Sequence, residues 1–403
     1  MKTKLLFALI VLIVAGNGHS QEFSVVAWGD NSHGQCDVPG PSKEFVGYIA
    51  VAGGQIHSIG LKEDGSIVAW GNNSYGQCDV PDPNSDFVAI PFGTSGYFSL
   101  GLKEDGSIVG WGDNSAGQCD IPEPNENFVA VGVGGFHSLG LKEDGSIAAW
   151  GWNEYGQCDV PGPNEGFVAI ACGLRHSLGL KEDGSILAWG DNEYGQCDVP
   201  EPNSDFVAVS AGQFYSLGLK ENGSIIAWGD NFIGQCDVPE PNEGFISVAG
   251  GWLHSIGLKE DSCIVAWGWD GHGQCVVPEP NSDFVQVAVG GAHRICLREI
   301  DTSIEGEETL PSTLFIQGLA PNPMSLSTTL TYMSPGLSSI TLEVYDTAGH
   351  LVRTRDLGGS TAGQHNAAWD GRDSSGAELT SGVYFIRLTS GEQKACASVV
   401  LMR

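Results

Sequence analysis

Histidine is the residue type in this chain best suited to chemistry, and it recurs in one motif, Gly-x-x-His. The motif occurs five times, at His57, His137, His176, His254 and His293. Imidazole binds transition metals and transfers protons near neutral pH, so a ring of these side chains could hold a metal. However, Phe98 and Tyr215 occupy the same position in two further copies of the surrounding sequence. An aromatic-sized packing or hydrogen-bonding role is therefore favoured, with no metal and no cofactor.

The carboxylates are the second candidates, because paired acids can serve as general acid and general base. They lie in hydrophilic turns that recur throughout the chain, such as Glu182-Asp183-Gly184, and no pair is distinctive. An Asp-x-Asp-x-Asp-Gly calcium loop does not occur in the sequence. The formal net charge of -31 argues against nucleic acid as a partner, because that binding needs Lys and Arg. The sequence thus predicts a protein that is not an enzyme.

Cysteine is the third reactive residue type, with eleven copies. Seven of them follow Gly-Gln at one recurring position: Cys36, Cys78, Cys119, Cys158, Cys197, Cys236 and Cys275. An odd set of equivalent positions does not pair off into disulfides, so we interpret these seven as small buried hydrophobic residues. The irregular cysteines are the better disulfide candidates, without a specified pairing: Cys172, Cys263, Cys296 and Cys396.

These residues are positioned by an internal repeat that runs from Ser24 to Arg298. Seven Trp-Gly pairs mark it, with spacings of 42, 41 and then 39 residues four times. One copy contains four short strand candidates separated by turn signals: 186–190, 197–199, 206–210 and 216–220. A period of this size with strand-rich units is typical of a propeller. We predict an all-β chain with seven four-stranded blades.

Strands that alternate in direction sort their connections onto two faces of such a disc. Loops like 191–195 and 212–215 fall on one face and are rich in aromatic residues, whereas segments like 200–205 and 220–223 fall on the other and are acidic. Large aromatic residues at loop tips are good interface anchors. The binding candidates on the aromatic face are Trp152, Phe214, Phe232, Trp252, Tyr155, Tyr194, Tyr75 and Tyr215. For Tyr155 and Tyr194, packing between blades is an equal alternative.

The ends of the repeat region predict how the ring closes. The Glu-Asp-Gly-Ser turn joins the last strand of one copy to the first strand of the next as a tight hairpin. The strand 25–29 has no hairpin partner before it, so we expect it to pair with 294–298. This pairing would remove the exposed edges of an open array.

The remaining segments predict export and a second domain. Residues 1–20 have two lysines, an apolar run and small residues before a cleavage point, as in a signal peptide. The propeller then covers residues 21–300, and an acidic linker follows at 301–312. Residues 313–403 contain strand signals without the 39-residue period, which suits a small immunoglobulin-like sandwich.

The motifs Ala-Trp-Gly, Asn-x-Tyr-Gly-Gln, Gly-x-x-His-Ser and Asp-Gly-Ser resemble those of the RCC1 (regulator of chromosome condensation) family. Their Gly-Gln-x-x-Val-Pro variant is similar to the secreted bacterial branch that includes the β-lactamase inhibitory protein II. This resemblance implies a seven-bladed propeller that binds a protein through the loops of one face. The tail, with motifs at 344–349, 369–373 and 382–385, resembles the FlgD-like immunoglobulin domain and the type IX secretion C-terminal sorting domain.

Two functions remain open at this point. The first is an exported, monomeric binding protein that docks a protein partner on its aromatic face, while the C-terminal domain engages the secretion machinery or attaches the protein to the cell surface. The second is a cell-surface carbohydrate-binding protein or glycan-active enzyme, because aromatic rings also stack on sugars.

Overall fold

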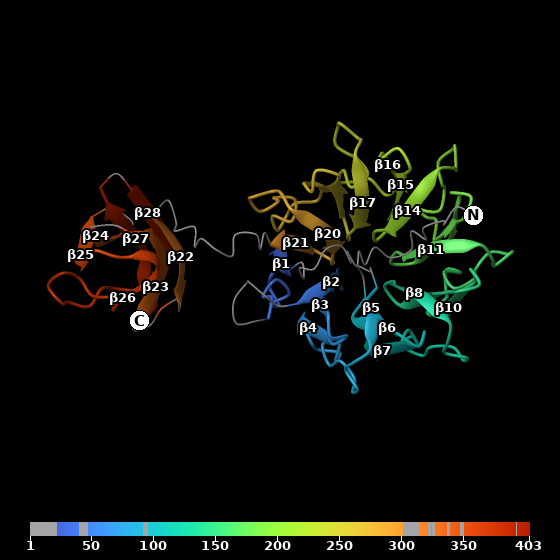
Figure 1. Cartoon of the computed structure of the whole chain (residues 1–403), viewed down its shortest axis with the longest axis horizontal. Coiled ribbons are helices and arrows are strands. Elements are labelled where there is room, and N and C mark those ends of the chain that lie inside the picture. Colours follow the sequence, from blue (N-terminus) through green and yellow to red (C-terminus); the bar gives the residue numbers. More distant parts are fainter. Residues whose placement is uncertain are drawn as a thin grey trace. The chain divides into compact units, whose positions relative to one another are not determined.

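The computed structural model of the chain describes residues 22–39, 47–91, 96–300, 314–320, 324, 327–336, 339–346, 350–391 and 393–403. It forms two compact units that divide between Ile300 and Asp301 (Figure 1). Every regular element in these residues is a β-strand, which confirms the predicted all-β class. The described part of the chain contains no helix that is long and apolar enough to span a membrane. The predicted signal peptide and linker lie outside the described residues.

The first unit is a ring of seven three-stranded antiparallel sheets, as the repeat count predicts (Figure 1). In chain order, the sheets are β2 Tyr48–Gly53, β3 His57–Lys62 and β4 Ile67–Gly71; β5 Phe87–Ala89, β6 Phe98–Lys103 and β7 Ile108–Gly112; β8 Phe128–Val133, β9 His137–Lys142 and β10 Ile147–Gly151; β11 Phe167–Cys172, β12 His176–Lys181 and β13 Ile186–Gly190; β14 Phe206–Ala211, β15 Tyr215–Lys220 and β16 Ile225–Gly229; β17 Phe245–Gly250, β18 His254–Lys259 and β19 Ile264–Gly268; and β20 Phe284–Val289, β21 His293–Ile300 and β1 Glu22–Gly29.

Three strands per blade correct the prediction of four. The segment 197–199 forms turns and irregular chain instead of a strand. The reason is local: the backbone N–H of Cys197 donates to the side chain of Asn192 at 2.8 Å, and that of Val199 donates to the Cys197 carbonyl at 3.1 Å. Because the segment is folded back on its own loop, it leaves no backbone groups arranged for a sheet ladder.

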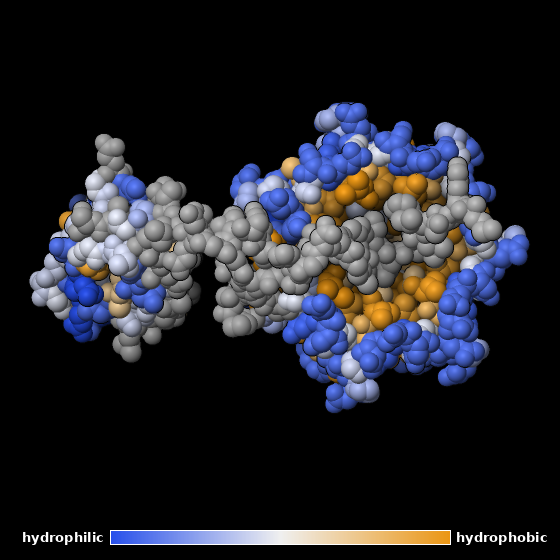
Figure 2. Space-filling view, viewed as in Figure 1, coloured by the Kyte–Doolittle hydropathy of each residue, from blue (hydrophilic) through white to orange (hydrophobic). Residues whose placement is uncertain are grey.

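The apolar core lies between neighbouring blades. One cluster combines Leu178, Leu180 and Ile186 of one sheet with Phe206 and Trp228 of the next. The first strands of neighbouring sheets contact one another, so they form the inner wall of the ring. Figure 2 shows the resulting division, with hydrophobic residues toward the centre and hydrophilic residues at the rim. A blade cannot bury its own faces, so the repeats are stable only as a closed ring.

The two ends of the repeat region close this ring as predicted. β1 pairs with β21 in an antiparallel register that sets Val25 opposite Leu297 and Gly29 opposite His293. The seventh blade therefore contains one strand from the beginning of the propeller and two from its end. Closure satisfies the backbone groups that a free edge would expose.

The second unit contains two sheets. One has the order β22-β23-β26 and the other β25-β24-β27-β28. Their shared apolar core includes Leu330, Val344, Trp369 and Ile386. This arrangement is consistent with the predicted immunoglobulin-like sandwich. The strands are β22 Phe315–Ala320, β23 Thr328–Pro335, β24 Ile340–Tyr345, β25 Leu351–Gly358, β26 Ala362–Trp369, β27 Gly382–Ser390 and β28 Gln393–Leu401.

Candidate functional site

The loops of each blade sort onto two faces of the propeller, as the alternation of strands predicts. On one face, the N–H of Asp191 after β13 donates to the Arg175 carbonyl in the β11–β12 loop at 2.9 Å. On the other face, Ile186 N–H donates to the Asn203 side chain at 2.8 Å, which ties the Pro-rich segment to the β12–β13 hairpin. We call the first face the aromatic loop face and the second the hairpin face.

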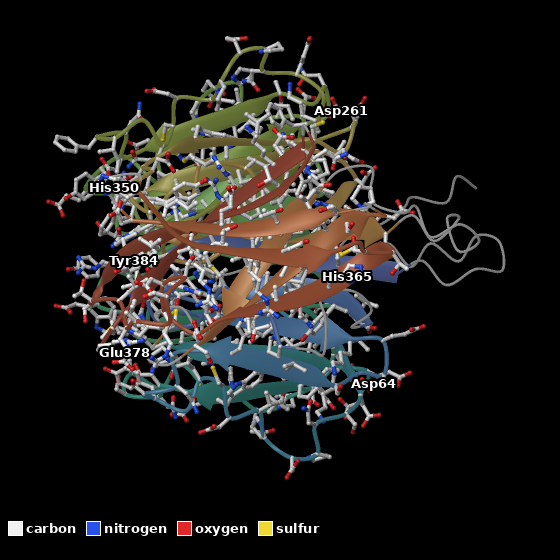
Figure 3. The ribbon with its side chains drawn as sticks, turned by 90° about the vertical axis from the view of Figure 1, so that its left-hand side faces the viewer. Asp64, Asp261, His350, His365, Glu378 and Tyr384 are labelled. Carbon is white, nitrogen blue, oxygen red and sulfur yellow. The ribbon has the colours of Figure 1, made fainter. Side chains whose placement is uncertain are left out.

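The hairpin face is acidic and its cations are engaged locally. Asp64 and Asp261, at hairpin tips of two different blades, lie on the same side of the ring (Figure 3). Hydrogen bonds from the hydroxyl and the backbone N–H of Ser66 lower the pKa of Asp64, so that turn holds an ionised carboxylate. The strand-end lysines lie over phenylalanine rings at Lys103, Lys142, Lys181, Lys220 and Lys259.

The aromatic loop face is built on a rigid hydrogen-bonded frame. In the loop after β13, Asn192 donates to Asp198 at 2.8 Å and accepts from the Cys197 N–H at 2.8 Å. The buried Gln196 side chain accepts from the Tyr194 N–H at 2.9 Å. The frame leaves the side chain five residues after the repeat Trp free to project from the loop. Loops held in this way lose little entropy when they bind a partner.

A continuous cluster of large side chains crosses three successive blades on this face. Trp152 packs edge-on against Phe136 and Tyr155, with ring centroids 5.8 and 5.3 Å apart. The guanidinium of Arg175 lies 4.8 Å from the Tyr155 ring, 5.7 Å from Trp152 and 5.9 Å from Phe214. Arg175 also donates to the Tyr155 hydroxyl at 3.1 Å. We call this group, with Tyr194, which lies 5.2 Å from Phe214, the Trp152 cluster.

Trp152 occupies a position at which five of the seven copies of the repeat carry Asp or Asn. Two of the equivalent residues, Asp113 and Asp230, accept a hydrogen bond from the buried Gln of their own loop, at 3.0 and 2.9 Å. In the loop of Trp152, the corresponding Gln157 Nε2 is buried without a partner, and so is Gln196 Nε2 in the next loop, where an Asp occupies the position. The indole therefore replaces a polar residue whose hydrogen bond to Gln is made in some copies of the repeat and absent in others.

Seven of the eight predicted binding residues lie on this face, with unequal exposure. Phe232 is 92% exposed and stands apart, whereas Tyr75, Tyr194 and Tyr155 are 55%, 48% and 39% exposed. Trp152, Phe214 and Trp252 are half-buried. Trp152, Tyr155, Phe214 and Tyr194 meet in the Trp152 cluster, and Tyr75 instead pairs with Tyr97 at 5.2 Å. No ring contact joins Phe232 or Trp252 to the cluster among the described residues.

Tyr215 corrects the prediction, because its side chain is completely buried. Its hydroxyl donates to the His254 carbonyl at 2.5 Å and lies 2.9 Å from the Ser255 hydroxyl. Tyr215 is the first residue of β15, so the alternation of the strand turns its ring between the blades. It fills a histidine position of the repeat and is a structural residue.

The motif histidines act in the same buried layer. Ser216 Oγ donates to the Gln196 carbonyl at 2.9 Å, so it must accept its hydrogen bond from His176 Nε2 at 3.0 Å. His57, His137 and His293 make the equivalent bond to a serine of the next blade. Burial lowers the pKa of His176 to about 3, so this imidazole is neutral. The structure therefore assigns these four histidines the hydrogen-bonding role.

The ten cysteines whose side chains the structure describes are unpaired. Each of the seven repeat cysteines is partly buried and directs its Sγ at a backbone carbonyl, as Cys197 does toward Asp191 at 3.2 Å. The predicted disulfide candidates Cys172, Cys263 and Cys296 are free thiols, which corrects that expectation. Cys172 and Cys296 are buried in the blade cores, and the side chain of Cys396 lies outside the described residues.

Two members of the Trp152 cluster were missing from the predicted site. Phe136 and Arg175 precede the motif histidine, a position that also carries Tyr97, Phe214 and Leu253. This variability was a usable signal, because a structural position of a repeat would keep one residue type. Arg175 was harder to find, since a search for aromatic anchors passes over a cation.

Two family models match the chain. The Regulator of chromosome condensation (RCC1) repeat matches residues 48–77, 93–118, 128–157, 167–196, 206–235 and 245–274. The FlgD Ig-like domain matches residues 324–394. The chain matches no curated protein.

Solved structures show the same propeller fold at low sequence identity. Prp20p from Saccharomyces cerevisiae is 17% identical, with a TM-score of 0.57 over 71% of this chain and 93% of Prp20p. Yeast RCC1 (Prp20), in a structure with Kap60, has a TM-score of 0.58 at 17% identity over 70% of this chain and 90% of the other. Human WBSCR16 has a TM-score of 0.55 at 17% identity, covering 70% and 99% of the two chains. Six repeats of the first unit thus match the RCC1 repeat, the unit has the propeller fold of these structures, and residues 324–394 match the FlgD Ig-like domain.

Proposed function

We propose that this chain is a non-enzymatic binding protein that docks a protein partner on its aromatic loop face. The observation that carries the proposal is the Trp152 cluster, in which an indole stands at a position where five of the seven copies of the repeat carry Asp or Asn. Positions that break a local structural rule without a local gain are expected at functional sites. Here the rule is broken in favour of the residue type that dominates protein interfaces.

The composition and packing of the cluster support a protein interface. Trp, Tyr and Arg are the residues most enriched among interface hot spots. Trp152 and Arg175 are half-buried and hold each other in place, so little side-chain freedom remains to be lost on binding. A second aromatic pair, Tyr75 and Tyr97, and the exposed Phe232 extend the contact surface around the ring.

The structural neighbours support protein binding at the level of the fold. The crystal structure of Prp20p was described together with the binding of Prp20p to Gsp1p and histones. Yeast RCC1 (Prp20) was solved bound to Kap60. An RCC1-like propeller is thus suited to binding proteins in general. The residues of the Trp152 cluster, and not the fold, would determine the partner of this chain.

Replacing Trp152 with Asp tests the proposal with a matched variant. The change makes the loop identical in sequence to residues 190–200 of the next blade. We expect the free energy of unfolding to change by less than about 1 kcal/mol, because the next blade accommodates the same loop sequence and the lost ring contacts are partly exposed. Loss of a hot-spot Trp should weaken partner binding by about 30-fold or more.

The measurement uses residues 21–403 as bait for envelope and culture-supernatant proteins, followed by titration calorimetry with each purified captured protein. Glu143→Gln, on the hairpin face, serves as the control variant and should bind as tightly as the parent chain. Equal binding by the parent and Trp152→Asp proteins would contradict a role for the cluster. A signal on a glycan array that Trp152→Asp abolishes would instead support the carbohydrate-binding alternative.

Export is the second part of the proposal. The signal-peptide pattern of residues 1–20 supports passage across the inner membrane, and the motifs at 344–349, 369–373 and 382–385, which resemble those of type IX sorting domains, support a sorting role for the FlgD Ig-like domain. The mature protein would be secreted or held at the cell surface, and its C-terminal domain would engage the secretion machinery. The secreted bacterial branch of RCC1 propellers, which the repeat motifs resemble, fits this placement.

Deletion of residues 313–403 tests this sorting role in a host with a type IX system. We expect the truncated protein to accumulate in the periplasm, because the sorting signal is removed while the signal peptide at residues 1–20 is retained. Fractionation and immunoblotting of cells and medium would measure the distribution. Full secretion of the truncated protein would exclude a sorting role for the C-terminal domain.

A further inference from the structure

Seven cysteines occupy one position of the repeat, so their thiols can be compared with one another within a single protein. In each blade the Sγ atom lies near the carbonyl of the residue six positions before it, from 3.2 Å for Cys197 to 3.5 Å for Cys119. All seven are free and partly buried. Differences in reactivity among them must therefore come from the neighbouring side chains.

Cys275 differs from the other six at three neighbouring positions. Each of the other six is followed by Asp, whereas Cys275 is followed by Val276, which is 65% exposed. Trp269 replaces the acid or amide that five of the other six copies have in this loop, a feature that it shares with Trp152 before Cys158. In the adjacent β21, Arg294 occupies the position of the conserved motif serine, and its Nη2 lies 3.6 Å from Cys275 Sγ. Only Asp270, in place of the loop Asn, adds negative charge.

Arg294 itself is an anomaly that the fold of the blade does not explain. Its side chain is fully buried, and its Nε and Nη1 atoms have no hydrogen-bond partner. Its Nη2 donates to the Ser255 carbonyl at 3.0 Å, and no carboxylate forms an ion pair with it in the described part of the chain. The substitution also leaves His254 Nε2 without the serine that the other motif histidines use. A buried guanidinium needs an anion, and among the acidic side chains near Arg294, which include Cys296 and Tyr215, the one that it hydrogen-bonds is the Cys275 thiol.

We propose that Cys275 is the reactive thiol of the propeller, a modification site that undergoes thiol–disulfide exchange with low-molecular-weight disulfides. Arg294 stabilises the negative charge on the Cys275 sulfur, and Val276 removes the repulsion that a following Asp exerts on each of the other six thiolates. Burial raises the pKa of Cys36, as of Cys236, to about 12, with Asp30 and Asp37 adding to the effect at Cys36. Burial also raises the pKa of Cys275 and Asp270 adds to this effect, but here the charge and the hydrogen bond of Arg294 act in the opposite direction.

The exchange is a balanced substitution at sulfur. The Cys275 thiolate attacks one sulfur of a disulfide R–S–S–R, the S–S bond of the reagent breaks, and a Cys275–S–S–R bond forms. The released thiolate takes up the proton that Cys275 lost. The adduct would lie at the base of the loop that presents Trp269 and His272, whose rings meet edge-on at 5.2 Å. The thiol state of Cys275 is thereby linked to one sector of the aromatic loop face.

The experiment follows the reaction of residues 21–403 with 4,4′-dithiodipyridine at pH 7.5, with mass spectrometry of digested samples to quantify the adduct at each cysteine. The protein carries Cys263→Ser, which restores the hairpin serine found at Ser66 and Ser224. We expect Cys275 to react at least about tenfold faster than any of the other six, since the thiolate fraction scales with acidity. Equal rates at all seven positions would overturn the proposal.

Two variants separate the contributions of Arg294 and Val276 to the reactivity of Cys275. Arg294→Ser restores the repeat residue and should bring the Cys275 rate into the range of the other six, whereas a Cys275 rate that stays high in this variant would contradict the role of Arg294. Val276→Asp, at an exposed position, should slow Cys275 several-fold without affecting the core. Unfolding of a variant would be recognised because all seven rates would rise together, and the comparison within the parent protein decides the proposal without any variant.

Discussion

Acidification from pH 7 to pH 5 is expected to destabilise the propeller steeply through its buried histidines. Burial lowers the pKa of His57 and His176 to about 3 and that of His137 and His293 to about 4. In the unfolded chain these imidazoles have a pKa of about 6.5. The unfolded state therefore binds protons that the folded state cannot, and the free energy of unfolding falls as the pH falls from about 6.5 to about 4. Above pH 6.5 this contribution is constant.

The free energy of unfolding is expected to depend steeply on pH, because the four histidines lie in one ring that unfolds as a unit and their contributions add. Each histidine contributes at most about 1.4 kcal/mol per pH unit, so the four together give an upper bound on the order of 5 kcal/mol per pH unit. Protonation of the many exposed carboxylates acts in the opposite direction by reducing the repulsion within a chain of net charge -31. A variant that changes one histidine separates the two effects.

His137→Tyr is that variant, because Tyr215 shows that the position accepts a tyrosine whose hydroxyl meets the serine of the next blade. Denaturant unfolding at several values between pH 4.5 and pH 8 would measure the free energy of unfolding. We expect the slope between pH 4.5 and pH 6 to decrease by up to about 1.4 kcal/mol per pH unit, and the two proteins to agree within about 1 kcal/mol at pH 8. An unchanged slope would show that His137 is accessible to protons in the folded state.

Replacing Gly173 with Ala is expected to cost about 3 kcal/mol of stability, the upper part of the range for overpacked cores. A Cβ atom there would lie 2.2 Å from Cε1 of His176 and 2.7 Å from the carbonyl oxygen of Gly212 in the next blade. Neither neighbour can move easily, since the imidazole is bonded to Ser216 and the carbonyl belongs to an adjacent backbone. The contact explains why Gly-x-x-His recurs as a unit.

Gly162→Ala is the matched control, because a Cβ at that position meets no atom within 4 Å. Other copies of the repeat carry Asp82 or Glu123 there, so a side chain is tolerated. Thermal and denaturant unfolding of both variants would compare the free energies directly. Similar stabilities of the two proteins would mean that the blade shifts to admit the methyl group, and the packing explanation of the motif would be wrong.

The residue pattern was sufficient for the architecture because the repeat is long, regular and tied to backbone chemistry. The spacing of the Trp-Gly pairs predicted the seven blades, and the missing hairpin partner of β1 predicted its pairing with β21. Both follow from local rules, since a strand edge needs a partner wherever it lies. The prediction of a fourth strand was wrong because the pattern of a short segment like 197–199 does not distinguish a strand from a turn. In the structure, the Asn192 side chain accepts the Cys197 N–H and holds this segment in a turn.

The sites were decided by contacts that no local pattern contains. Tyr194 points outward because it projects from a loop that hydrogen bonds hold in place. Tyr215 points inward because it is the first residue of a strand that packs between blades. Trp152 and Phe214 approach the same guanidinium although 62 residues separate them, and Arg294 reaches Cys275 from another blade. The sequence by itself determined which blades form and how the ring closes, through periodicity and backbone hydrogen bonding. Only the tertiary structure decided which side chains share a surface, because that depends on the packing of one blade against the next.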